Sequence, residues 1–225
     1  MGKEGAATAS PGRIPSMRGL LLGLIDPAEG LLALMNAGLA GLTDDEYLWE
    51  PVADCWSVRP VSDLRTPLAP WQAPDGWAAE IVHPDPQPSP FTSIAWRLTH
   101  MTGSVNVASA TVRGVRRDDG AIDDAFASSG EAVGRTAAEA IALWDGAIAL
   151  LRGRIEDAEE RGLFRLERQW WDPPDHAAPV WQQVIYFAYF EPASHGAEVR
   201  LLRDLYRHTK AGQVALLPPR NRTPT

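Results

Sequence analysis

Nine prolines between residues 51 and 90 set the strongest limit on how this chain can fold. Proline lacks a backbone N–H and its ring clashes with the preceding turn, so no regular helix continues through such a segment. We therefore predict a long connection here, with one or two short strands. Connections of this length in compact domains are often functional or closely packed, and this one also carries Trp56, Trp71 and Trp77.

Outside this connection, apolar residues recur at three- and four-residue steps, which is the spacing of one helix face. Helices are predicted over residues 27–41, 92–113, 136–160 and 180–208. Thr136 and Glu139 form a capping box at the start of the third helix. Residues 43–46 form a similar cap before a short helical turn. Four amphipathic helices and long connections predict an all-α four-helix bundle with long crossover loops, a fold that places metals between facing helices.

The organisation of the 225 residues follows from the same pattern, because nothing in the chain indicates a second domain. Residues 1–16 are small and polar, and we predict a disordered tail there. The helical-bundle domain is expected over residues 17–212, with a loose C-terminal tail over residues 213–225. The non-periodic stretch 114–134 and the segment around Trp170 and Trp171 are expected to be loops.

Composition excludes several classes of partner. The net charge of −8 would repel nucleic acid and anionic lipid, so we expect neither as a partner. No apolar run approaches the roughly 18 residues that a membrane-spanning helix needs. Cys55 is the only cysteine, which forbids an intrachain disulfide and fits a cytoplasmic location. Nine tryptophans suit one core or one cavity, and the tryptophan-rich loops also leave open an apolar homodimer interface.

The five histidines fall into two groups. His83 and His176 lie in predicted loops, where a solvated imidazole is the ordinary interpretation, and His208 lies near a helix end, where its partial charge suits the helix dipole. His100 and His195 lie inside predicted helices. A single helical histidine is more often a hydrogen-bonded core residue than a metal ligand, so His100 alone does not predict a site.

His195 has Glu191 four residues before it, which places both side chains on the same face of a helix. Such a pair can share an ion, and a third ligand from a facing helix would leave a coordination position for water or substrate. The same spacing also fits a simple ion pair. Pro192 should bend the helix beside Glu191, and this bend could either aim the two side chains inward or separate them.

Four segments together resemble the DinB-like (YfiT/DinB) superfamily of helical bundles. They are LTDDEYLWEP at residues 42–51, CWSVR at 55–59, FTSIAWRLTH at 91–100 and HGAEVRLLRDLY at 195–206. The resemblance implies metal ligands at His100, from the spacing Trp96 to His100, and at His195, which precedes Gly196 and Glu198. It also implies a first histidine on the fourth helix, and this chain has Glu191 there instead. The implied metal site is His100, Glu191 and His195.

Two imidazoles and one carboxylate suit zinc, and also nickel, manganese or iron. The resemblance implies a metal-dependent S-transferase that uses a low-molecular-weight thiol such as mycothiol on a small electrophile, and a hydrolase is equally compatible with the site. The alternative is a non-catalytic binding or interaction protein whose metal site has degenerated through Glu191. Cys55 is interpreted as a bystander, and Trp49, Trp56 and Trp96 as core residues.

Overall fold

The structure is a computed structural model that describes residues 16–210, apart from residues 29, 31, 70, 71, 73–75, 83, 85, 115–132 and 169–175. Both predicted tails therefore fall outside the described residues, except for Ser16, which caps the first helix by accepting a hydrogen bond from the Gly19 N–H at 3.1 Å. His83, Trp71 and most of the two predicted loops, with Trp170 and Trp171, also lie outside them.

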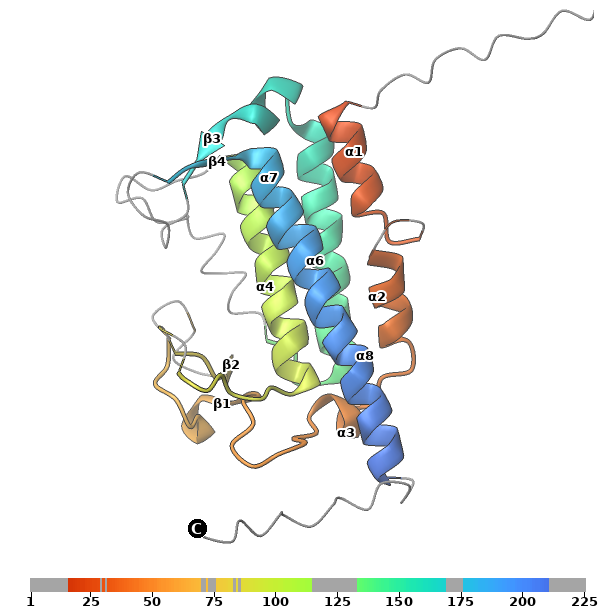
Figure 1. Ribbon diagram of the computed structural model, residues 1–225, viewed down its shortest axis with the longest axis vertical. Coiled ribbons are helices and arrows are strands. Elements are labelled where there is room, and N and C mark those ends of the chain that lie inside the picture. Colours follow the sequence, from red (N-terminus) through yellow and green to blue (C-terminus); the bar gives the residue numbers. More distant parts are fainter. Residues whose placement is uncertain are drawn as a thin grey trace, which may run out of the picture.

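The described residues form the predicted all-α bundle of four helical columns (Figure 1). The first column consists of α1 (Met17–Leu24) and α2 (Leu32–Leu39), the second of α4 (Ile94–Arg113), and the third of α6 (Ala137–Asp157). The fourth contains α7 (Val180–Ile185), a π-helical turn η3 (Tyr186–Phe190) and α8 (Glu191–Lys210). Helix α1 was not predicted, because its eight residues are too few to show a clear period.

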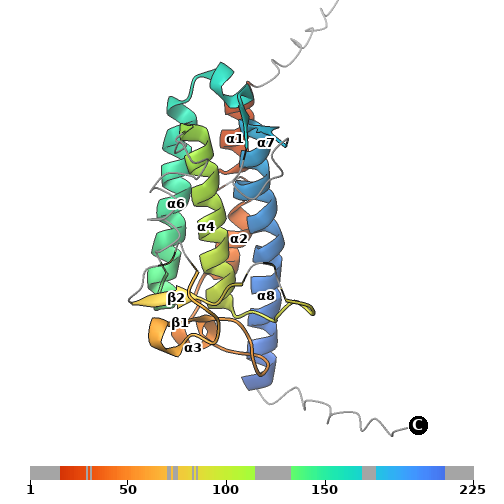
Figure 2. The same cartoon turned by 90° about the vertical axis from the view of Figure 1, so that its left-hand side faces the viewer.

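Hydrogen bonds between helix ends establish the direction of the columns. The Met17 N–H donates to Glu160 at 2.7 Å, so α1 begins beside the end of α6. The Ala137 N–H donates to Asp44 at 2.8 Å, so α6 begins beside the short helix α3 (Asp44–Tyr47). Helices α4 and α6 thus run in one direction and the other two columns in the opposite direction (Figure 2). The connection from α4 to α6 joins opposite ends of the bundle.

The proline-rich connection packs against the N-terminal end of α4. It contains two short antiparallel strands, β1 (Val58–Pro60) and β2 (Trp77–Ala79), with a 3-10 turn η1 (Val61–Asp63). Glu80 is fully buried and holds this segment together, because it accepts a hydrogen bond from the Ser57 N–H at 2.9 Å and lies 3.0 Å from Arg59 Nε. The predicted connection with short strands is confirmed.

A second small hairpin closes the opposite end of the bundle and was not predicted. It comprises a 3-10 turn η2 (Glu160–Phe164) and the two-residue strands β3 (Leu166–Glu167) and β4 (Ala178–Pro179).

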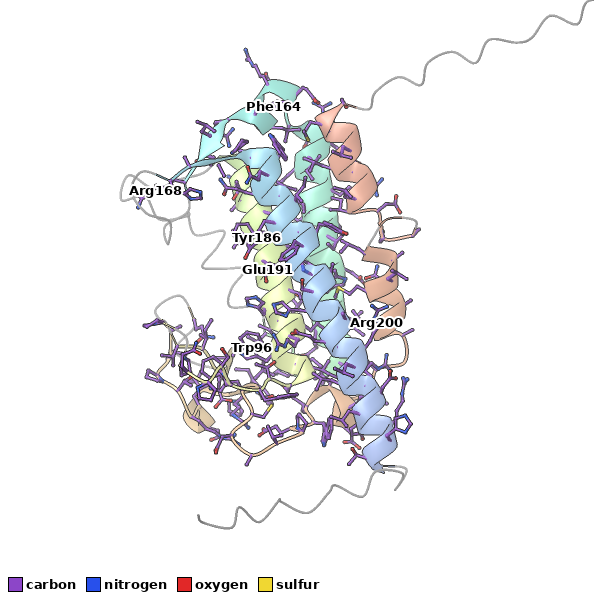
Figure 3. All side chains as sticks on the ribbon, viewed as in Figure 1. Trp96, Phe164, Arg168, Tyr186, Glu191 and Arg200 are labelled. Atoms are coloured by element: carbon purple, nitrogen blue, oxygen red, sulfur yellow. The ribbon has the colours of Figure 1, made fainter. Side chains whose placement is uncertain are left out.

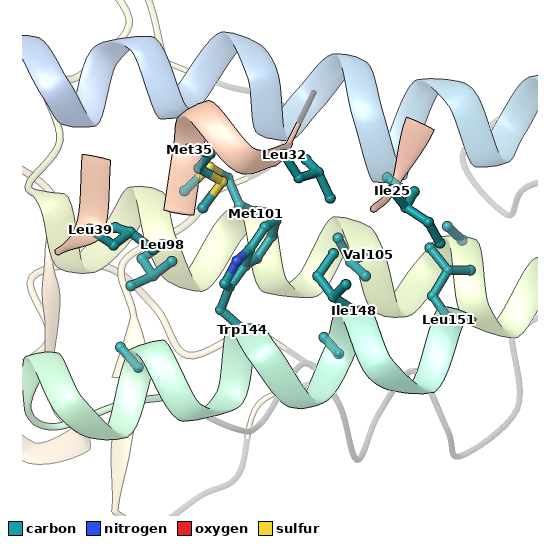
Figure 4. Close-up of a cluster of buried hydrophobic side chains, with 14 of the residues drawn as sticks. Ile25, Leu32, Met35, Leu39, Leu98, Met101, Val105, Trp144, Ile148 and Leu151 are labelled. Atoms are coloured by element: carbon teal, nitrogen blue, oxygen red, sulfur yellow. The ribbon is translucent and has the colours of Figure 1, made fainter. Parts of the chain in front are cut away.

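Helix α4 is the central element of the hydrophobic core. Fourteen of its twenty residues are buried, and it packs against α6 and the fourth column. Leu98, Met101 and Val105 face apolar residues of α2 and α6, including the fully buried Trp144 (Figure 4). The Trp144 indole donates to Asn36 of α2 at 2.9 Å, which satisfies its buried N–H. Helix α4 also packs against α8, and the candidate site spans these two helices.

The described tryptophans differ in burial. Trp144 is fully buried, whereas Trp49, Trp56 and Trp96 are only partly buried, so the interpretation of these three as core residues was too simple. None of the helices in the described part of the chain combines the length and apolar character of a membrane span.

Candidate metal centre

The structure brings His100 of α4 together with Glu191 and His195 of α8. The Glu191 Oε2 atom lies 3.3 Å from His100 Nε2 and 3.2 Å from His195 Nε2. One ligand atom of each residue lies within 4.8 Å of the other two. Figure 3 shows Glu191 on the fourth column where it faces α4. Pro192, which lies between the two residues at the start of α8, therefore does not separate their side chains from His100.

The two separations from the Glu191 oxygen are compatible with a coordination sphere, and all three ligand atoms lie within 4.8 Å of one another. Zinc bonds of about 2.0–2.1 Å in a tetrahedron separate the ligand atoms by roughly 3.3 Å. The two separations measured from the Glu191 oxygen are 3.3 and 3.2 Å. The His100 side chain is 34% exposed, so water or a small molecule can reach the site from this side. The arrangement suits a divalent ion with three protein ligands and an open position.

Glu198 fixes the orientation of the His195 ring. Its Oε2 atom lies 2.5 Å from His195 Nδ1, one helical turn along α8. Arg97 Nη1 lies 2.9 Å from the same Nδ1 atom, so both neighbours hold this edge of the ring. When Nδ1 carries a proton, it donates to Glu198, and Nε2 is the atom that faces Glu191. Arg97 of α4 lies 3.1 Å from the same Glu198 oxygen and holds it in place. A carboxylate behind a ligating imidazole is a common arrangement in metal sites.

Trp96 connects the proline-rich connection to the site. Its ring stacks on His100, with centroids 5.0 Å apart and an interplanar angle of 13°. The Trp96 indole N–H donates to the Glu80 carbonyl at 2.6 Å, so the buried end of the connection determines where this ring lies. The connection thus has a role that the sequence left undefined: it positions the ring against which His100 rests.

The charges of the site favour a bound cation. Hydrogen bonds with His100 and His195 hold the pKa of Glu191 well below its usual range, against the opposing effect of burial. Glu191 is therefore an ionised carboxylate at any physiological pH. Burial lowers the pKa of His195, but its hydrogen bonds with Glu191 and Glu198 outweigh burial and leave the pKa raised. In the absence of a metal ion, the raised pKa of His195 favours a proton on this imidazole beside the Glu191 carboxylate.

Tyr186 is a further neighbour of the carboxylate. Its phenol hydrogen-bonds Glu191, and this bond, together with burial, raises the pKa of Tyr186. The two residues are joined by the π-turn, in which the Glu191 N–H donates to the Tyr186 carbonyl.

The Cys55 thiol does not have the properties of a reactive group. It is fully buried, its thiol donates to the Trp56 carbonyl at 3.5 Å, and burial together with the charge of Glu50 raises its pKa to about 12. A thiol that remains protonated is a poor nucleophile, which agrees with the interpretation of Cys55 as a bystander.

Comparison with known families supports the relationship suggested by the sequence motifs. The sequence model of the DinB superfamily matches residues 29–199, which is most of the chain. The chain belongs to the DinB superfamily. No curated protein and no solved structure gives a significant match. Membership accounts for the helical bundle of this DinB-superfamily chain. That His100, Glu191 and His195 are its metal ligands stays a prediction.

Among the described residues, the other two histidines of this DinB-superfamily protein take no part in the cluster. His176 and His208 are exposed, as expected. Sequence reasoning missed three contributors to the site: Arg97, Glu198 as the partner of His195, and Tyr186. Glu198 could have been found, because it lies three residues after His195 on the same helix face. Arg97 and Tyr186 depend on the packing of α4 and on the π-turn, which leave no simple periodic signal.

Proposed function

We propose that this protein binds one divalent ion through His100, Glu191 and His195. The observation that carries the proposal is the pair of separations of 3.3 and 3.2 Å between the Glu191 oxygen and the two imidazole Nε2 atoms. Two nitrogen donors and one oxygen donor suit zinc best among the common ions, and they also accommodate nickel, manganese or iron. Because the pKa of Glu191 is depressed, its carboxylate is negatively charged at neutral pH, which favours a bound cation.

We further propose that the centre is enzymatic, as a metal-dependent S-transferase or hydrolase. A bound ion would supply Lewis acidity, which lowers the pKa of a water molecule or a thiol at its open position. The chain's own contribution is to orient the ligands: Glu198 holds His195, and Trp96 supports His100. A low-molecular-weight thiol such as mycothiol, available in a reducing cytoplasm, is the proposed second substrate, and a small electrophile is the first.

A bundle without a metal is the competing function. Hydrogen bonds from the Nε2–H groups of two imidazoles to one carboxylate also account for separations of 3.2–3.3 Å. In that case the cluster would only link α4 to α8, and the protein would be a binding or interaction module. The two functions differ in whether purified protein contains a stoichiometric ion.

Elemental analysis of the purified protein separates them. The wild-type chain is expected to hold about one divalent ion per chain, and His100→Ala and His195→Ala are each expected to lose it. His208→Ala removes an exposed histidine outside the cluster and is the matched control, which should retain the ion. A wild-type protein without metal after exposure to zinc, or variants that retain it, would overturn the proposal.

A further inference from the structure

The fourth helical column changes its winding immediately before the candidate ligands. Helix α7 ends at Ile185, five residues form the π-turn, and α8 begins at Glu191. The Glu191 N–H donates to the Tyr186 carbonyl five residues earlier, which defines the wider turn. Pro192 has no N–H to donate to the Ala188 carbonyl, so a continuous α-helix would lack this bond and would clash with the proline ring. The wider turn relieves that conflict.

The π-turn determines which side chain lies beside Glu191. In an α-helix, residues five apart are rotated by about 140° from one another and point to different faces. In a turn closed between residues i and i+5, the two residues instead lie nearly one above the other. Tyr186 and Glu191 are such a pair, and Figure 3 shows them close together on this column. The extra residue in the turn therefore brings a phenol to the carboxylate.

Two phenylalanine rings contact the phenol ring of Tyr186. The Tyr186 ring stacks on Phe190, with centroids 5.7 Å apart and an interplanar angle of 20°. It meets Phe187 edge-on, with centroids 4.9 Å apart. The Tyr186 side chain is 47% exposed, and these ring contacts accompany the hydrogen bond of its hydroxyl to the Glu191 carboxylate. Of the contacts that Tyr186 makes here, the one that reaches the site is with Glu191, so its effect on the site passes through this carboxylate.

We propose that Tyr186 is a positioning residue for Glu191 and makes this carboxylate a one-oxygen ligand. A hydrogen bond from the phenol stops the carboxylate from rotating about its last torsion, so that Oε2 stays directed at both imidazoles. A carboxylate restrained in this way keeps one coordination position open for a small molecule. This inference rests on the proposed function, because it concerns the same ion.

The test uses the metal-stripped full chain, a zinc titration against a chelator of known affinity, and the absorption spectrum of bound cobalt. Tyr186→Phe is expected to weaken zinc binding by about 10- to 100-fold, the usual effect of losing a partner behind a ligand. Its cobalt spectrum should lose intensity, because a carboxylate free to bind through both oxygens raises the coordination number. Tyr189→Phe removes a phenol from the same turn and should match the wild type in both measurements.

A double variant separates positioning from a general structural effect. In a Glu191→Ala background, Tyr186→Phe should change neither zinc affinity nor the cobalt spectrum further, because the phenol acts through the carboxylate. Equal affinity and equal spectra for the wild type and Tyr186→Phe would overturn the inference while leaving the metal site intact. A wild type that binds no zinc would overturn the proposed function, and this inference with it.

Discussion

The Glu198 carboxylate lies 2.5 Å from Nδ1 of His195, on the side of the imidazole ring opposite Glu191. The two carboxylates therefore bracket one ring, with Glu198 at Nδ1 and Glu191 at Nε2.

Glu198→Gln should weaken zinc binding by about 10- to 100-fold without abolishing it, because His195 remains but is no longer oriented. A zinc titration measures this change, with Asp204→Asn, which alters an exposed carboxylate on α8, as the control. Equal affinities in the wild type and Glu198→Gln would refute the role of Glu198.

Zinc affinity should fall as the pH is lowered, and the fall should come from the imidazoles. The pKa of His195 is raised, so a proton competes with the ion at this ligand even above the ordinary histidine value of about 6.5. The pKa of Glu191 is depressed, so this carboxylate stays ionised and adds no dependence near neutral pH. Titrations between about pH 5.5 and about pH 8.5 should show log K rising by up to about one unit per pH unit for each imidazole that must lose its proton. An affinity that is constant across this range would contradict the ligand assignment.

Cys55 should be unreactive in the folded protein. Burial and the charge of Glu50 raise its pKa to about 12, so the thiolate is scarce at pH 8 and the sulfur is also inaccessible. Iodoacetamide should label Cys55 only after denaturation, as measured by intact-protein mass spectrometry. Rapid labelling of native protein would reopen the case for Cys55 as a nucleophile.

A buried ion pair fastens α8 to the junction between α2 and α3. Arg203 Nε lies 2.8 Å from Glu46 Oε1, both side chains are 5% exposed, and Arg203 also donates to the carbonyls of Gly38 and Ala40. Arg203→Met leaves Glu46 buried with an uncompensated charge, which should lower the free energy of unfolding by about 3–5 kcal/mol.

Arg207→Met is the matched control for this ion pair, because Arg207 is 59% exposed and lies 3.9 Å from Glu46. Its effect on urea denaturation should be small. If the two variants had the same free energy of unfolding, the ion pair between Arg203 and Glu46 would not stabilise the packing of α8 as we describe.

Much of the fold could be predicted because its signals are local. The helical spacing of Leu98, Met101 and Val105 and the cap at Thr136 depend only on nearby sequence, and α4 and α6 lie within a few residues of their predicted bounds. The site was only partly predictable. The spacing of Glu191 and His195 indicated a pair, but their approach to His100 depends on how α4 packs against α8.

Pro192 shows most clearly what could not be predicted from the sequence. The sequence shows that a proline interrupts the fourth helix, but a kink and a π-turn are both compatible with this fact. Only the three-dimensional structure shows that the turn widens and brings Tyr186 to Glu191.

X-ray absorption spectroscopy of the zinc-loaded protein tests the central claim most directly, because it reports the atoms bound to the ion. We predict two imidazole nitrogens from two histidines at about 2.0–2.1 Å, with the remaining ligands being oxygen. His100→Ala should not retain the ion through purification, so it is loaded with excess zinc, and any ion that it then holds should have one imidazole fewer in its first shell. A first shell that contains sulfur, or that is the same in the wild type and His100→Ala, would contradict an ion shared between α4 and α8.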